Sequence, residues 1–145
     1  MAKILVIHGA GMNMRGKSQL EVFGPTTLTQ YDEHLRKYAA ELKVDIDIFH
    51  SNAEGEIIDK LYAAHETGFA GCIINPAGFT VGYAALNNAI AQVSFPTIEV
   101  HVSNPALRGR ISDVGRHTRG VVTGFGLHGY YLAMRGLMEL AQAKK

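Results

Sequence analysis

An α/β domain with one parallel sheet is the fold class that this sequence predicts, on three observations. The chain has 145 residues, of which 47% are apolar and 19% are charged, and a length of roughly 150 residues is usual for one domain. Short apolar runs recur along the chain, and most are followed by apolar residues at helical spacing. This alternation is typical of parallel strands whose sheet is covered by helices on both faces. We therefore expect a single domain over residues 1–145.

The first strand and helix are the most clearly marked elements. Residues 3–8 form a continuous apolar run, which predicts a buried strand that ends at the glycine-bearing residues 9–11. A loop follows to Pro25, after which Thr26 or Thr27 can cap a helix. The apolar residues of that helix are Leu28, Tyr31, Leu35, Tyr38 and Leu42.

The remaining elements continue the alternation. Residues 44–48 alternate between apolar and polar, as a strand does, and residues 51–54 look like the start of the next helix. Further strands are expected at 71–75, 97–102 and 120–123, and further helices at about 83–93 and 127–143. Because crossovers between parallel strands are right-handed, this order favours a doubly wound, flavodoxin-like five-stranded sheet.

Composition and charge exclude several classes of protein. Fourteen Lys and Arg against 13 Asp and Glu give a net charge of +1, which argues against a nucleic-acid binder and against an acidic disordered chain. The single cysteine, Cys72, lies in an apolar run and is expected to be a buried structural thiol. The first apolar run is too short for a signal peptide or a membrane span, so we expect a cytoplasmic protein with no membrane partner.

Polar side chains gather at the predicted carboxyl ends of the strands, where sheets of this kind bind ligands. His8 and His101 are expected at neighbouring strand ends, where an imidazole can transfer a proton near pH 7. Glu99 lies two residues before His101, hence on the same strand face. No two histidines have the spacing of a helical metal site, so no metal is predicted.

Two further segments bear on cofactor and anion binding. Residues 124–129 match the pattern GxGxxG, but no acid follows about 20 residues later to hold a ribose, so no dinucleotide cofactor is predicted. Residues 100–137 carry five arginines and a single acid, Asp113. This segment is either a solvated basic loop or a loop that receives an anion, because guanidinium groups match carboxylates and phosphates.

Four segments taken together resemble the type II 3-dehydroquinate dehydratases, and their order and spacing hold from Ile4 to Leu137. The segments are HSNAEGEIID (50–59), INPAGFT (74–80), IEVHVSN (98–104) and TGFGLHGY (123–130). The resemblance implies a flavodoxin-like subunit, a dodecamer built as four trimers, no cofactor and a small anionic or polyhydroxylated substrate. It also implies a trans-dehydration through an enolate. In that reaction a lid tyrosine with a partner arginine removes a proton beside a ketone, an ordered water and an asparagine stabilise the enolate, and a histidine protonates the departing hydroxyl.

Part of the machinery that the resemblance implies is present. Asn75 matches the enolate-stabilising asparagine, His101 matches a residue that holds the substrate, and Glu99 matches the acid behind the histidines. Together with His8 they are the expected catalytic residues. The residues expected to bind substrate are Asn13, Gly78, Tyr83, Val102, Ser103 and Arg108 or Arg110.

Other parts of that machinery are replaced. Phe23 stands where the family has its tyrosine, Ser18 where it has the lid arginine, and Val81 where it has the acid histidine. Because phenylalanine and valine cannot transfer a proton, these replacements predict negligible 3-dehydroquinate dehydratase activity. New titratable groups stand near the retained edge, at His8 and His128.

The pattern of retained and replaced residues favours a repurposed enzyme. It would carry out lyase, hydrolase or isomerase chemistry on a small oxygenated ring carbonyl or carboxylate, with Asn75 and backbone amides stabilising an enolate or oxyanion. His8 or His101 would transfer the proton. One alternative is a non-catalytic protein that binds a small anion in the same pocket or serves in assembly. The other is a genuine 3-dehydroquinate dehydratase of the shikimate pathway, with Tyr31 as a displaced lid tyrosine.

Overall fold

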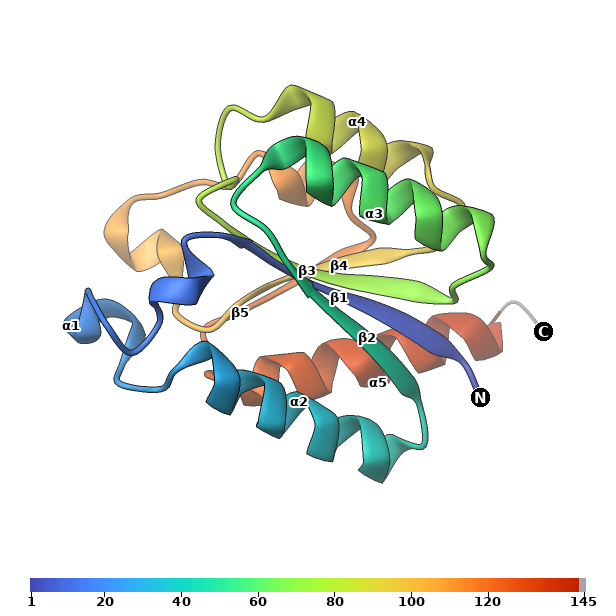
Figure 1. Ribbon diagram of the computed structural model, residues 1–145, viewed down its shortest axis with the longest axis horizontal. Coiled ribbons are helices and arrows are strands. Elements are labelled where there is room, and N and C mark those ends of the chain that lie inside the picture. Colours follow the sequence, from blue (N-terminus) through green and yellow to red (C-terminus); the bar gives the residue numbers. More distant parts are fainter. Residues whose placement is uncertain (144–145) are drawn as a thin grey trace.

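Five parallel strands form one sheet in the computed structural model, which describes residues 1–143 (Figure 1). The strands are β1 (Lys3–Ala10), β2 (Asp45–His50), β3 (Gly71–Ala77), β4 (Thr97–His101) and β5 (Gly120–Thr123). They lie in the order β2-β1-β3-β4-β5, and every neighbouring pair is parallel. This is the doubly wound, flavodoxin-like order, so the predicted fold class is confirmed.

Helices cover both faces of the sheet (Figure 1). One face carries α2 (Leu28–Leu42) and α5 (His128–Ala143), and the other carries α3 (Glu54–Glu66) and α4 (Ala84–Gln92). A short helix that the sequence did not predict, α1 (Leu20–Phe23), lies in the long loop after β1. Three short 3-10 turns complete the loops, at Met12–Met14, Pro105–Arg108 and Val114–His117.

Two apolar clusters, one on each side of the sheet, form the core. Because successive side chains of a strand point to opposite faces, β1 contributes to both clusters. Ile4 and Val6 pack in the cluster that α2 and α5 cover, whereas Leu5 and Ile7 pack in the cluster that α3 and α4 cover. Cys72 is fully buried in the second cluster, and burial raises the pKa of its thiol, which confirms a structural rather than a reactive cysteine.

Local signals explain where several elements begin and end. The Thr27 hydroxyl accepts a hydrogen bond from the Gln30 amide at 3.2 Å, and the Gln30 side chain accepts one from the Thr27 amide at 2.9 Å. This capping box fixes the start of α2 at Thr27, one of the two threonines that the sequence offers as a cap. In contrast, β3 runs two residues further than predicted, through Pro76, because β1 continues beside it as far as Ala10.

Stability in acid should depend on His50, which is half-buried at the end of β2. Burial lowers its pKa from 6.5, and the nearby His8 lowers it further against weaker opposing contacts. The unfolded chain therefore binds the proton more readily, so His50 reduces stability as the pH falls below its unfolded value of 6.5. We expect His50→Asn to flatten the loss of stability between about pH 7.5 and about pH 5.5 in urea denaturation. His34→Asn, at an exposed site, is the control, and an unchanged slope in His50→Asn would contradict the prediction.

No helix within residues 1–143 combines the length and the apolar character that crossing a bilayer requires.

Candidate active site

A cavity of about 470 Å³ opens at the carboxyl edge of the sheet, beyond the ends of β1, β3 and β4. Its position agrees with the rule that selected the strand ends from the sequence. Its polar lining consists of Arg15, Gln19, Asn75, Thr80, His101, Ser103, Arg108 and Arg110. Within residues 1–143 no Asp or Glu lines the cavity, so it presents positive charge to whatever enters. Such a lining suits a small anion.

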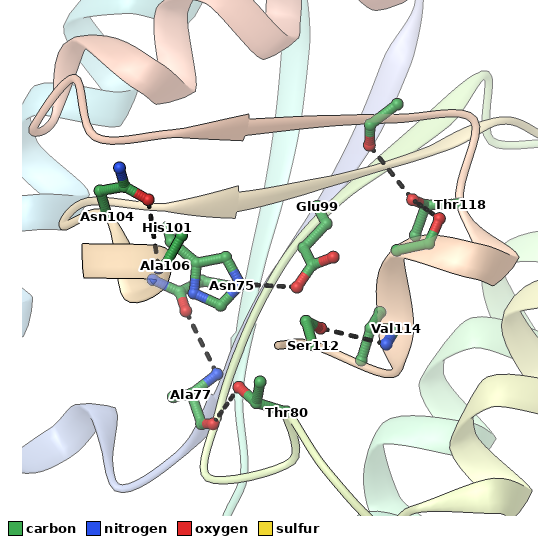
Figure 2. A network of polar contacts seen from close by, with 12 residues as sticks. Asn75, Ala77, Thr80, Glu99, His101, Asn104, Ala106, Ser112, Val114 and Thr118 are labelled. Atoms are coloured by element: carbon green, nitrogen blue, oxygen red, sulfur yellow. Dashed lines mark hydrogen bonds and ion pairs between the residues drawn. The ribbon is translucent and has the colours of Figure 1, made fainter. Parts of the chain in front are cut away.

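His101, at the end of β4, is held by a buried carboxylate. Its Nε2 lies 2.5 Å from Oε2 of Glu99, which is only 1% exposed. Figure 2 shows this contact, together with the hydrogen bond between Asn75 and Ala77. An ionised carboxylate only accepts hydrogen bonds, so it favours the tautomer with the proton on Nε2. Because His101 also lines the cavity, Nδ1 is the nitrogen left to accept a proton from a ligand.

Asn75, near the end of β3, is fixed from behind. Its Oδ1 accepts a hydrogen bond from the Ala77 amide at 3.2 Å, and its Nδ2 donates to the Tyr130 hydroxyl at 3.2 Å. Tyr130 comes from α5 and is fully buried, and burial raises the pKa of its hydroxyl, so that it stays protonated. An amide nitrogen carries two hydrogens, so one N–H of Asn75 remains for a ligand in the cavity.

His8 occupies a different place from the one the sequence suggested. It is fully buried, and its Nε2 lies 2.8 Å from Oδ1 of Asp32 on α2. It does not line the cavity. The expectation that His8 and His101 end neighbouring strands is wrong, because β3 lies between β1 and β4 and pairs Asn75 with His8.

The predicted substrate-binding residues separate into two groups. Those that line the cavity are Gly78, Val102, Ser103, Arg108 and Arg110, and the guanidinium of Arg108 donates to the Ser103 hydroxyl at 3.1 Å. Asn13 and Tyr83 are not among the lining residues. Asn13 is exposed on the turn after β1. Tyr83 immediately precedes α4 and packs against the core, with its ring centroid 4.9 Å from that of Phe79.

Tyr31, the tyrosine considered as a displaced base, also lies outside the cavity. It lies on α2, is 1% exposed and packs in the core cluster that α2 and α5 cover. Burial raises the pKa of its hydroxyl, and the nearby Arg15 offsets only part of that rise. A buried phenol that resists ionisation is a poor general base.

Sequence reasoning missed two residues that shape the cavity. The Cζ atom of Arg15 lies 3.7 Å from the centroid of the Phe23 ring, and both side chains line the cavity. The sequence predicts no role for Arg15, and it marks Phe23 only as the replacement of a tyrosine. Their contact depends on where α1 lies relative to the start of the loop after β1, for which the sequence gives no signal.

The site therefore combines a His–carboxylate pair and an oriented amide with a cationic cavity at the carboxyl edge of a doubly wound sheet, which defines an α/β protein with a small-molecule site. The sequence model of the family described as dehydroquinase class II matches residues 2–138, so the chain belongs to the class II dehydroquinases.

Individual relatives agree with this assignment. A 3-dehydroquinate dehydratase of Helicobacter hepaticus is 41% identical over 142 residues, covering 96% of this chain and 90% of the relative. One from Caldanaerobacter subterraneus is 42% identical over 137 residues, covering 92% of each. The crystal structure of a type II dehydroquinase from Butyrivibrio crossotus superposes with a TM-score of 0.89 at 33% identity, covering 94% of this chain and 97% of that one.

These comparisons overturn the prediction of a repurposed enzyme. Relatives at about 40% identity over nearly the whole chain are named 3-dehydroquinate dehydratase, which favours the alternative of a genuine dehydratase. The mistaken prediction gave two replaced side chains, Phe23 and Val81, more weight than the rest of the chain. In the structure Val81 is 60% exposed and lies outside the cavity, whereas His101, paired with Glu99, lines it.

Proposed function

We propose that this chain is a 3-dehydroquinate dehydratase, a lyase that removes water from 3-dehydroquinate. The observation that carries the proposal is the cationic cavity in which Glu99 orients His101 beside the amide of Asn75. The names of the relatives support the same substrate. A hydroxylated ring that bears a ketone and a carboxylate suits a cavity lined by guanidinium, hydroxyl and amide groups.

The proposed reaction begins with transfer of a proton from the carbon beside the ketone to Nδ1 of His101. Glu99 stabilises the imidazolium that forms, as a buried carboxylate does behind a catalytic histidine. The free N–H of Asn75 donates to the ketone oxygen as negative charge develops on it, and so stabilises the enolate and the transition states that lead to and from it. The electron pair of the enolate then expels the hydroxyl from the next carbon. Solvent protonates this group, His101 returns its proton to solvent, and the products are one water and a conjugated enone.

The carboxylate of the substrate is assigned to the arginines that line the cavity. Arg108, which donates a hydrogen bond to the Ser103 hydroxyl, is one of them. Guanidinium groups bind carboxylates strongly and hold their orientation, so this contact places the ring relative to His101.

Product identification tests the proposed reaction. Protein purified from a host that lacks its own dehydroquinase is incubated with 3-dehydroquinate, and the mixture is followed by NMR and mass spectrometry. The expected product has lost one water and carries a double bond conjugated to the ketone. Binding of 3-dehydroquinate, seen as a rise in melting temperature, with no such product would show a binding protein instead of a lyase.

We also propose that the subunits assemble into the dodecamer of four trimers that the family resemblance implies. Four apolar side chains are exposed along the loop after β4 and the edge strand β5, at Leu107, Ile111, Val121 and Phe125. Exposed apolar groups beside an unpaired strand edge favour burial against another subunit. Cytoplasmic location stays a prediction.

Light scattering tests the assembly. We expect the mass of twelve 15.7-kDa chains for the wild type, and a smaller species for Ile111→Asp, because a charge replaces an apolar side chain that is 80% exposed in the monomer. Glu66→Asp, on the exposed end of α3, is the matched control and should keep the large mass. A monomeric wild type at micromolar concentration would rule the assembly out.

A further inference from the structure

Arg15 is a buried cation without a counter-ion. Arg15 is the residue after the turn Met12–Met14, and it is 8% exposed. Within residues 1–143 no Asp or Glu oxygen lies within 4.0 Å of its guanidinium, and its Nε has no hydrogen-bond partner there. Burying an unpaired charge is costly, so a position like this one is maintained where a ligand supplies the missing charge. Arg15 lines the cavity, where a ligand can reach it.

Phe23 connects this cation to a second one. The Cζ atom of Arg15 lies 3.7 Å from the ring centroid, and the Cζ atom of Arg108 lies 5.8 Å from the same centroid. Both distances are within the range of a cation–π interaction. The three residues come from three separate segments: the loop after β1, the short helix α1 and the turn after β4. A single aromatic ring therefore holds two guanidinium groups at one cavity.

We propose that Arg15, Phe23 and Arg108 form a clamp for the carboxylate of the substrate. The carboxylate lies between the two guanidinium groups and supplies the negative charge that Arg15 lacks, while Phe23 is a positioning residue that fixes the spacing of the two cations. The identity of the ligand as 3-dehydroquinate rests on the proposed function, but the preference for an anion does not. The clamp also gives Phe23 a role beyond the absence of a tyrosine hydroxyl: a ring that cannot ionise does not compete with the carboxylate for Arg15.

Calorimetric titration with two probes tests the clamp. The probes are 3-dehydroquinate and its uncharged methyl ester, titrated into His101→Ala and into the double variant His101→Ala/Arg15→Met, because the wild type is proposed to convert the acid during the titration. We expect Arg15→Met to weaken binding of the acid by about 10- to 100-fold and binding of the ester by less than about threefold, because only the acid has a charge to lose. Phe23→Leu should also weaken binding of the acid more than binding of the ester. Arg15→Lys should bind the acid more tightly than Arg15→Met does. Arg116→Met, at an exposed site, should change neither.

The melting temperature without ligand separates binding from a structural role. Replacing an unpaired buried cation with an apolar group should leave the melting temperature of Arg15→Met unchanged or higher. The clamp would be overturned if Arg15→Met lost the same affinity for the acid as for the ester, or lost affinity for neither. A melting temperature of Arg15→Met more than about 4 °C below that of the protein with Arg15 would also overturn it. None of these measurements uses turnover. The results can therefore contradict the clamp without contradicting the proposed dehydratase function. A protein that binds the acid through Arg15 but does not convert it would support the clamp and contradict the proposed function.

Discussion

Replacing His101 with alanine is expected to lower kcat for 3-dehydroquinate by about 10²- to 10⁴-fold, the usual cost of losing one positioned general base. Apart from the arginines, His101 is the one titratable side chain among the described residues that line the cavity, and its Nε2 is already engaged by Glu99. No other lining group within residues 1–143 can replace it as a proton acceptor near neutral pH. The rate is measured as formation of the conjugated enone at saturating substrate.

Two companion variants sharpen this test. Glu99→Gln keeps the size of the side chain but removes the charge that favours the imidazolium, so kcat should fall by a smaller factor than in His101→Ala. His117→Ala removes an exposed histidine outside the cavity and should leave kcat unchanged. If His101→Ala keeps at least half of the wild-type kcat, another residue takes the proton and the assigned mechanism is incorrect.

Gly9→Ala is expected to destabilise the fold by about 3 kcal/mol or more, at the upper end of what overpacking costs. A Cβ atom at Gly9 would lie 2.0 Å from the carbonyl oxygen of Pro76 and 2.9 Å from that of Asn75. Both atoms belong to the backbone of β3, which is paired with β1 and cannot move aside as a flexible side chain would. Urea denaturation of the variant measures the loss. Because the clash is with the backbone of Asn75, activity should fall as well.

Gly55→Ala is the matched control for this substitution. Gly55 lies on α3 with open space around its Cβ position and no positive φ angle, so alanine fits and favours the helix. We expect a gain of about 0.5–1 kcal/mol. A free energy of unfolding for Gly9→Ala within about 1 kcal/mol of the wild type would show that β1 and β3 are less closely packed than the structure indicates.

Most of the fold could be predicted because strands and helices leave periodic patterns in the sequence. The alternation of apolar runs with helical spacing gave the five strands, and Thr27 marked the start of α2 through local chemistry alone. The helix α1 could not be foreseen, since its four residues (Leu20–Phe23) carry no periodic signal of that length and lie beside the cavity, where Phe23 meets Arg15.

The site was predictable where strand ends define it and unpredictable where side chains from distant segments meet. His101 follows from the strand-end rule, Asn75 from the family resemblance, and Glu99 from its spacing to His101. The partner of His8 is Asp32, 24 residues later on a helix, and no spacing in the sequence points to it. The wrong prediction of function has a related cause. It rests on the hydroxyl that Phe23 lacks, whereas the sequence does not show that the Phe23 ring contacts the guanidinium of Arg15.

The initial rate of enone formation from 3-dehydroquinate is the measurement that tests the central claim most directly. It is recorded at several concentrations of wild-type protein and of His101→Ala, both purified from a host without its own dehydroquinase. The proposed function predicts a rate proportional to wild-type concentration, with a turnover of about 1 s⁻¹ or more per subunit, in the usual range for enzymes. A wild-type rate no higher than that of the mixture without protein would contradict it, and a rate in His101→Ala equal to that of the wild type would contradict the role of His101.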